Sequence, residues 1–275
     1  MEEREDAAAR RALGQQAALF ALLKSGVPTA GTAVAWRAIT EAAARTLGAA
    51  RAAIWVLTPD RQALVAGDRF DVARGHLPPG DVLEASRFPS YFHALRWTRA
   101  IVAPDAVADE RTAEVATGYA PAMDAASMLH AGIWHEGQAR GAVCVESVGE
   151  RRDWTADEQQ FAASLADIAA MVLVYESLDA ARARLQESQE LLTSALRSSP
   201  DPMLVVRLTD HRILLVNERL KQVTGLDDAA LLGRTPLELG LWADPAQRDR
   251  WVARLVSEGA VRDHEADLRL REGRV

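Results

Sequence analysis

The sequence predicts an α+β protein made of two small antiparallel-sheet units joined by one long helix. Between Thr155 and Leu196 there is neither proline nor glycine, and apolar residues recur at steps of three and four, as in an amphipathic helix. Short apolar runs bounded by turn residues lie on both sides of this stretch, which is typical of hairpin strands. At about 1.5 Å per residue the helix is roughly 60 Å long. We therefore expect it to connect two units rather than to fill one.

The composition is that of an ordinary soluble protein and limits the classes of partner. A chain of 275 residues, 49% hydrophobic and 26% charged, is long enough for about two domains. The net charge of −7 disfavours nucleic acid and anionic membranes as partners. The apolar runs are far shorter than the roughly 20 residues that span a bilayer. The acidic start lacks a signal pattern and Cys144 is the single cysteine, so we expect a cytoplasmic protein.

The first unit begins with two helices and a hairpin. Residues 1–25 form an amphipathic helix, because Leu13, Phe20 and Leu23 fall near one face. We assign residues 26–176 to the unit itself. A second helix starts near Val34, and a hairpin of Ala52–Leu57 with Ala63–Val65 follows it. Next comes a loop-rich wall from Gly75 to Ala108 that contains a short helix, Tyr91–Trp97. The last elements expected are a helix Asp109–Tyr119 and a hairpin of Ser127–Trp134 with Gly141–Val148.

The second unit, residues 198–275, starts where Pro200 and Pro202 end the long helix. Asn217 is placed to cap a short helix, Glu218–Thr224, that Gly225 terminates. The other elements expected are strands Met203–Val206 and Ile213–Val216, helical pieces Ala229–Leu232 and Ala246–Glu258, and a strand His264–Leu270. That last strand would expose an unpaired edge, so we expect the protein to continue past Val275.

Several motifs carry a family resemblance. In the first unit they include Tyr91-Phe92-x-x-Leu95, Ile101-x-x-x-Asp105-x-x-x-Asp109-Glu110-Arg111-Thr112, Gly141-x-Val143-Cys144-Val145-Glu146 and Trp154-Thr155-x-Asp157-Glu158-x-x-Phe161. In the second they are Ser199-Pro200-Asp201, Ile213-Leu214-Leu215-Val216-Asn217, Thr224-Gly225 and Leu231-Leu232-Gly233-Arg234-Thr235. Through these residues the first unit resembles a GAF domain and the second a PAS domain whose last strands are missing. The pair is similar to the input region of a bacterial sensor histidine kinase or cyclic-di-GMP signalling protein.

The resemblance and the pattern of side chains together suggest two ligand pockets. The candidate residues of the GAF-like pocket are Tyr91, Phe92, Asp105, Arg111, Thr112, Tyr119 and Trp134. Those of the PAS-like pocket are Met203, Val205, Leu220 and Leu237. The aromatic residues would supply an apolar wall, and Arg111 or Thr112 would donate to an anion. An ordinary packed core needs the same residue types, so that alternative stays open.

No motif in the chain indicates catalysis, and no residue is assigned a catalytic role. Gly225 to Gly233 lacks the lysine and spacing of a phosphate-binding loop. The signatures of a diguanylate cyclase and of a histidine kinase ATP lid are also absent. The six histidines show no metal-ligand spacing, so no metal site is expected. Cys144 alternates with valines in an apolar strand, which favours a packing role. The sequence does not identify a cofactor.

The long helix, expected over residues 155–197, carries a heptad pattern from about residue 171. Met171, Leu178, Leu185 and Leu192 are seven residues apart, and Val174 leads a second row of small residues. Leaving Leu185 and Leu192 in water would forgo roughly 1.5–3 kcal/mol of burial each. We therefore expect a parallel homodimer through Met171, Val174, Leu178, Leu185 and Leu192.

These observations predict a cytoplasmic sensory input module. A small ligand or a partner would act on the GAF-like unit, and the paired helix would relay the change to an output domain, a histidine kinase. Two alternatives stay open, namely the input region of a diguanylate cyclase or phosphodiesterase, and an unliganded dimerisation scaffold.

Overall fold

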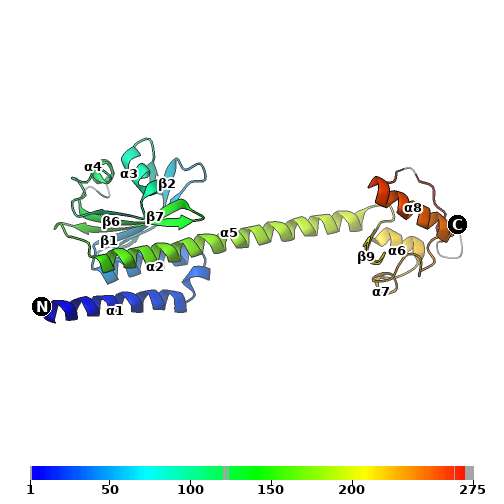
Figure 1. The fold of residues 1–275 in the computed structure, drawn as a ribbon, viewed down its shortest axis with the longest axis horizontal. Helices are drawn as coiled ribbons and strands as arrows, with labels where there is room; N and C mark the ends of the chain where they lie inside the picture. The colour runs from blue at the N-terminus through cyan, green and yellow to red at the C-terminus, as the bar shows by residue number, and fades with distance from the viewer. Residues whose placement is uncertain (1, 120–121, 123, 263, 270–275) are drawn as a thin grey trace. The chain divides into compact units, whose positions relative to one another are not determined.

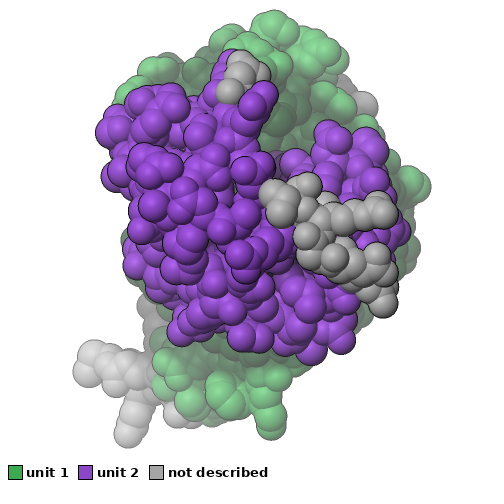
Figure 2. All heavy atoms as spheres, turned by 90° about the vertical axis from the view of Figure 1, so that its right-hand side faces the viewer, with its two compact units in different colours: residues 1–180 green, residues 181–275 purple. Residues whose placement is uncertain are grey.

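The computed structural model describes residues 2–119, 122, 124–262 and 264–269. The chain divides into two compact units, Met1–Ala180 and Ala181–Val275, shown in different colours in Figure 2. Both units combine helices with antiparallel strands, which confirms the predicted fold class. One long helix, α5 (Ala156–Ser198), begins in the first unit and ends in the second.

The first unit is built on one antiparallel sheet with the strand order β3-β2-β1-β7-β6-β5, and β4 pairs with β2. The two predicted hairpins are present, as β1 with β2 and as β6 with β7. The strands are β1 (Arg51–Leu57), β2 (Ala63–Asp71), β3 (Gly75–Leu77), β4 (Val82–Glu84), β5 (Ala100–Ala103), β6 (Ala125–His135) and β7 (Gln138–Val148). The helices are α1 (Glu2–Lys24), a 3₁₀ turn (Val27–Thr29), α2 (Thr32–Leu47), α3 (Pro89–Trp97) and α4 (Ala113–Gly118).

Helices cover both faces of this sheet (Figure 1). On one face α2 and the first part of α5 pack against alternate residues of the central strands, such as Ile54, Leu129 and Val143. On the other face α3 and α4 pack against the intervening residues, such as Met128 and Cys144. Because side chains alternate along a strand, two separate cores form from the same strands.

Two elements expected in the first unit differ from the structure. The wall between Gly75 and Ala108 contains the short strands β3, β4 and β5 in addition to α3, and runs of three or four residues are too short for a visible alternation. Helix α4 begins at Ala113 rather than at Asp109. The Asp109 carboxylate instead accepts hydrogen bonds from the backbone and side chain of Arg111, which holds a turn there.

The exposure of the apolar side chains of α5 changes along the helix. From Phe161 to Val172 its apolar face is buried in the first unit, whereas Leu185 and Leu192 are 61% and 64% exposed. It is the one helix of the described residues that is long and apolar enough to cross a membrane by length and composition. Half of its most apolar window is buried inside the fold, as in the core helix of a soluble protein, so this is weak support for a span.

The second unit contains the two-stranded antiparallel sheet β8 (Leu204–Val206) and β9 (Ile213–Val216), with α6 (Glu218–Thr224), α7 (Asp228–Leu231) and α8 (Pro245–Glu258). Asn217 caps α6 as predicted, and its Oδ1 accepts from Leu220 N at 2.9 Å. The same atom accepts from Met203 N at 2.8 Å, and Nδ2 donates to Asp201 O at 2.7 Å. This fully buried amide therefore ties the segment after α5 to β8 and α6.

The strand expected over His264–Leu270 is not formed in its described part, residues 264–269. Only an isolated antiparallel bridge joins Leu268 to Trp242. A ladder needs a neighbouring strand to supply hydrogen bonds along its whole length. Here the bridge consists of two such bonds, in which Ala243 N donates to Asp267 O and Arg269 N donates to Leu241 O. Leu270 lies outside the described residues.

Candidate functional site

A ring of charged side chains lies at one end of the central strands in the first unit. Arg51 on β1 lies 3.0 Å from Glu146 on β7 and 2.7 Å from Asp124. Arg69 on β2 lies 2.6 Å from Asp81. Both arginine side chains are more than four-fifths buried, so these pairs are less screened than surface ion pairs. The first pair joins the ends of β1 and β7, and the second joins β2 to the segment before β4.

Tyr119 joins the ring to the aromatic core. Its hydroxyl donates to Asp81 at 2.5 Å and accepts from Arg69 at 3.1 Å, and its ring meets Trp55 edge-on at 5.7 Å between centroids. Burial raises the pKa of Glu146 above its ordinary value, although Arg51 acts in the opposite direction. The hollow between these groups has a volume of about 90 Å³. A water cluster or a small ion fits such a volume, and a drug-sized ligand does not.

The other aromatic residues predicted for the GAF-like pocket lie away from this hollow. Tyr91 and Phe92 on α3 are buried in the core that faces α3 and α4. Trp134 is half-buried near the end of β6. Among the predicted residues, Tyr119 is thus the one that lines the hollow.

The predicted polar residues have partners within the unit. The Asp105 carboxylate lies 2.6 Å from Arg151 and accepts from the amides of Val107 and Ala108. Arg111 pairs with Asp109 and donates to Val102 O at 2.9 Å. The fully buried Thr112 hydroxyl donates to Ala106 O at 2.8 Å. These contacts organise the loop before α4, and the ligand roles of Asp105, Arg111 and Thr112 stay predictions.

Three buried polar groups form a separate cluster under α3. The Tyr91 hydroxyl lies 3.0 Å from His130 Nδ1 and 3.6 Å from Cys144 Sγ, and His130 and Cys144 are opposite each other on β6 and β7. His130 Nε2 is buried without a hydrogen-bond partner in the described structure. Burial raises the pKa of the Cys144 thiol and lowers the pKa of His130 to about 4. The thiol is therefore protonated at neutral pH and unreactive.

His130 makes the stability of the first unit depend on pH. Its pKa falls from 6.5 in the unfolded chain to about 4 in the fold, so the unfolded state binds the proton more readily. The contribution of His130 to the free energy of unfolding is fully present above pH 6.5 and is lost as the pH falls toward 4. Lowering the pH from 7 to 5 is expected to reduce the free energy of unfolding by about 2 kcal/mol through this residue. Urea unfolding at both pH values measures it, and His130→Asn is expected to show a pH-dependent loss smaller by that amount. Equal losses in the two proteins would contradict the prediction.

The second unit contains a larger and mostly apolar cavity of about 520 Å³. It lies among β8, α6, α8 and the segment at Trp242. Two of the residues predicted for the PAS-like pocket, Val205 and Leu220, line it, whereas Met203 and Leu237 are outside the lining. Its volume is in the range of small-molecule sites, roughly 300–1,000 Å³.

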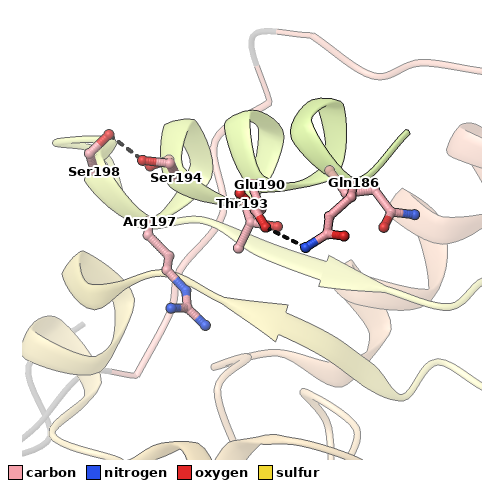
Figure 3. Close-up of a pocket in the computed structure, with 7 residues that line it drawn as sticks. Gln186, Glu190, Thr193, Ser194, Arg197 and Ser198 are labelled. Carbon is pink, nitrogen blue, oxygen red and sulfur yellow. Dashed lines mark hydrogen bonds between the residues drawn. The ribbon is translucent and has the colours of Figure 1, made fainter. Parts of the chain in front are cut away.

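A shallow polar pocket runs along the last turns of α5 and is shown in Figure 3. Its lining comes from this helix alone, so it does not enclose a ligand. Gln186, Glu190, Thr193 and Arg197 recur there at steps of three and four, and Gln186 Nε2 donates to Glu190 Oε1 at 3.0 Å. This polar stripe lies on a different side of the helix from Leu185 and Leu192, so the exposed part of α5 is amphipathic.

Sequence reasoning missed the charged ring and most of the second cavity. Charged residues inside otherwise apolar strands, such as Arg69 and Glu146, were the available signal for the ring. The pair Trp242 and Trp251, whose centroids are 5.9 Å apart, was the signal for the cavity. No group of three or more metal-ligating side chains occurs in the described residues.

Comparison with protein families identifies both units. The GAF domain family model matches residues 33–173, which is just over half of the chain. A PAS domain model matches residues 190–257. No curated protein sequence matches the chain.

Two solved phytochrome structures support the fold. Bacteriophytochrome RpBphP3 from the photosynthetic bacterium R. palustris aligns over 68% of this chain and 43% of its own, with 14% identity and a TM-score of 0.53. The Stigmatella aurantiaca phytochrome photosensory core module aligns over 67% of this chain and 41% of its own, with 13% identity and a TM-score of 0.52. The GAF domain of an Acinetobacter phosphoenolpyruvate-protein phosphotransferase aligns over 60% of this chain and 96% of its own, with 12% identity and a TM-score of 0.49. The chain thus spans about two fifths of the two phytochrome structures, and identities this low show the fold alone.

Proposed function

This chain belongs to the GAF domain family, and from that premise we propose that it is a cytoplasmic sensory input region of a bacterial signal-transduction protein. The GAF and PAS domains support the general role of a sensor input module. In the proposal the GAF domain occupies residues 26–176 and the PAS domain residues 198–275. The output that they control is a histidine kinase.

The observation that carries the proposal is the continuity of α5. One helix of 43 residues supplies core residues to the GAF unit and continues into the PAS unit. A displacement of its first half is therefore transmitted along the helix, because the helical hydrogen bonds resist bending. Its exposed leucines favour a parallel homodimer in which two such helices pair from about Met171 onward.

The seam, by which we mean the row of heptad residues along which the two helices would pair, has features that suit a relay. Its large residues alternate with small ones, and Ser188 places a hydroxyl on it. Such a seam is weaker than one with leucine at every position. Two arrangements of the paired helices with similar energy are then accessible. A signal then shifts the population between them.

A scaffold without a ligand is the second candidate, and one observation favours it for the GAF unit. Buried side chains such as Tyr91, Phe92 and Met128 pack in the core between the sheet and α3, and the charged hollow has only about 90 Å³. In that case the GAF unit acts through packing and dimerisation, and ligand binding belongs to the PAS unit.

The experiment that tests the proposal measures mass and turnover on the purified chain. Light scattering at low micromolar concentration is expected to give twice the monomer mass of 29.9 kDa. Incubation with ATP or GTP is expected to give no product. A monomer at high micromolar concentration would overturn the relay, and turnover of either nucleotide would overturn the assignment as an input region.

A further inference from the structure

We propose that a groove beside α5 in the GAF unit binds a small organic phosphate. The inference rests on the proposed function and deepens it, because it names a ligand class and a site for the sensory unit. It depends on the place of the groove in the fold, on the charges around it and on the backbone conformation of Arg61.

The groove lies where α5 extends beyond the core of the first unit. It has a volume of about 310 Å³ and lies between α5 and the two turns that join β1 to β2 and β6 to β7. All of its lining residues, from Val56 to Ser177, belong to the first unit. The volume is at the lower end of the range for small-molecule sites, roughly 300–1,000 Å³. A compact ligand in the groove therefore contacts the sheet and the helix at once.

Apolar side chains form one part of the lining. Val56 and Leu173 are half-buried and pack against the core that the sheet shares with α2 and α5. Leu57 and Val174 extend this apolar surface. Val174 also belongs to the heptad row of α5, so a ligand in the groove contacts a residue of the proposed dimer seam. Such a ligand shifts the population between two arrangements of the seam if it binds one of them better.

The ionisable side chains in the lining are all basic. They are Arg61, His135 and Arg140, and no carboxylate lines the groove in the part of the chain that the structure describes. The Arg61 guanidinium reaches across to the start of β7, where its Nη2 donates to Ala139 O at 3.0 Å. That contact occupies one of its five N–H donors. Arg96 adds a further guanidinium nearby, because its Nη2 donates to Arg61 O at 3.2 Å.

Two carboxylates of the same turns lie outside the lining. Asp60 stabilises its own turn, since its Oδ1 accepts from the Thr58 hydroxyl at 2.6 Å and from Gln62 N at 3.1 Å. Glu136 is 78% exposed and lies 3.9 Å from His135 Nε2. An anionic ligand therefore meets basic groups in the groove and does not displace a lining carboxylate.

The arrangement of the basic groups favours a phosphate over a carboxylate. Arg61 comes from the turn after β1, whereas His135 and Arg140 flank the turn between β6 and β7. A guanidinium presents its donors in a planar fork that fits either anion. A phosphate monoester, however, has three acceptor oxygens and up to two negative charges. Donors from two turns can thus bind different oxygens of one phosphate.

The backbone of Arg61 is consistent with a role for its side chain. Its φ is 60°, in the left-handed region that glycine and asparagine adopt more readily than other residues. A residue in this conformation carries a cost in folding free energy, and such strain recurs at binding sites. Here the strained position directs the guanidinium toward β7 and the groove.

The test titrates three probes into the full chain by calorimetry: phenyl phosphate, inorganic phosphate and benzoate. Phenyl phosphate is expected to bind at least tenfold more tightly than inorganic phosphate, because its ring covers the apolar lining. It is expected to exceed benzoate by a similar factor, because it offers an additional charge-assisted hydrogen bond. Equal binding of benzoate would overturn the phosphate class, and equal binding of inorganic phosphate would overturn the organic body. No binding of phenyl phosphate at millimolar concentration would overturn the proposal.

Variants place the binding in the groove. Arg61→Asn removes the charge and suits the left-handed backbone, so it is expected to reduce the affinity for phenyl phosphate about tenfold while the urea midpoint is unchanged or higher. Arg140→Gln, an exposed position on β7, is expected to reduce the affinity in the same direction. The control is Arg37→Gln, which removes an exposed arginine on α2 outside the groove and is expected to leave the affinity unchanged. Full affinity in both Arg61→Asn and Arg140→Gln would overturn the proposal.

Light scattering on the same samples separates this inference from the relay. A dimer that binds none of the probes would overturn only the ligand site. A monomer that binds phenyl phosphate in an Arg61-dependent way would retain the ligand site and overturn the dimeric relay.

Discussion

A chain with Leu185→Lys and Leu192→Lys is expected to be monomeric at concentrations where the unaltered chain is dimeric. Both leucines are more than 60% exposed on α5 in the single chain, and the heptad spacing places them on one seam. Burying a leucine contributes about 1.5–3 kcal/mol, and two chains bring four of them to the seam. Their loss, together with like-charge repulsion, is expected to raise the dissociation constant by a factor of about 10⁴ or more. Light scattering over a dilution series measures this change.

The matched control moves the same substitutions one residue along the helix. Gln186→Lys with Thr193→Lys adds the same charge at the same heptad interval, but on the polar stripe of α5. This variant is expected to remain a dimer with little change in affinity. If the control dissociates as readily as the leucine variant, charge repulsion and not the apolar seam governs assembly. If neither dissociates, α5 is not the dimer contact.

The elements that local chemistry determines could be predicted from the sequence. Helix α6 begins and ends at the predicted residues because Asn217 caps it and Gly225 ends it in a left-handed conformation. The hairpin β6–β7 is found around the turn of Glu136 and Gly137, both of which have positive φ. Helix α5 continues without interruption from Ala156 because neither proline nor glycine occurs between Thr155 and Leu196.

The candidate sites were harder to predict because residues far apart in the sequence form them. The ring of Arg51, Arg69 and Glu146 exists only because β1 lies between β2 and β7 in the sheet. Sheet order is a long-range property, and no local pattern specifies it. Similarly, Arg248 on α8 and Val205 on β8, about forty residues earlier, line the same cavity only because the unit packs these elements near each other. Spacing along the chain identified some lining residues, such as Val205 and Leu220, but not the cavity as a whole.

Gly141→Ala is expected to destabilise the GAF unit by about 3 kcal/mol, the upper end of what an added methyl group costs in a packed interior. Gly141 lies on β7 between β1 and β6, opposite Val56 and Ile133. A Cβ atom there would come closer than 3.0 Å to the carbonyl oxygen of Trp55, a separation that Cβ atoms essentially never show. Because the obstacle is backbone, relief requires the central strand pair to move apart, with loss of ladder hydrogen bonds. Urea unfolding followed by circular dichroism measures the change.

Two other glycines give the controls that identify the cause. At Gly132 the added atom would meet the indole of Trp134, a half-buried side chain that can rotate away, so Gly132→Ala is expected to cost less than Gly141→Ala. At Gly14, inside α1, nothing lies within 4 Å, and Gly14→Ala is expected to stabilise the helix by about 0.5–1 kcal/mol. The predicted order of stability is therefore Gly14→Ala, the unaltered chain, Gly132→Ala and Gly141→Ala. If Gly141→Ala were as stable as Gly132→Ala, the close approach of β7 to the Trp55 carbonyl would not limit this sheet.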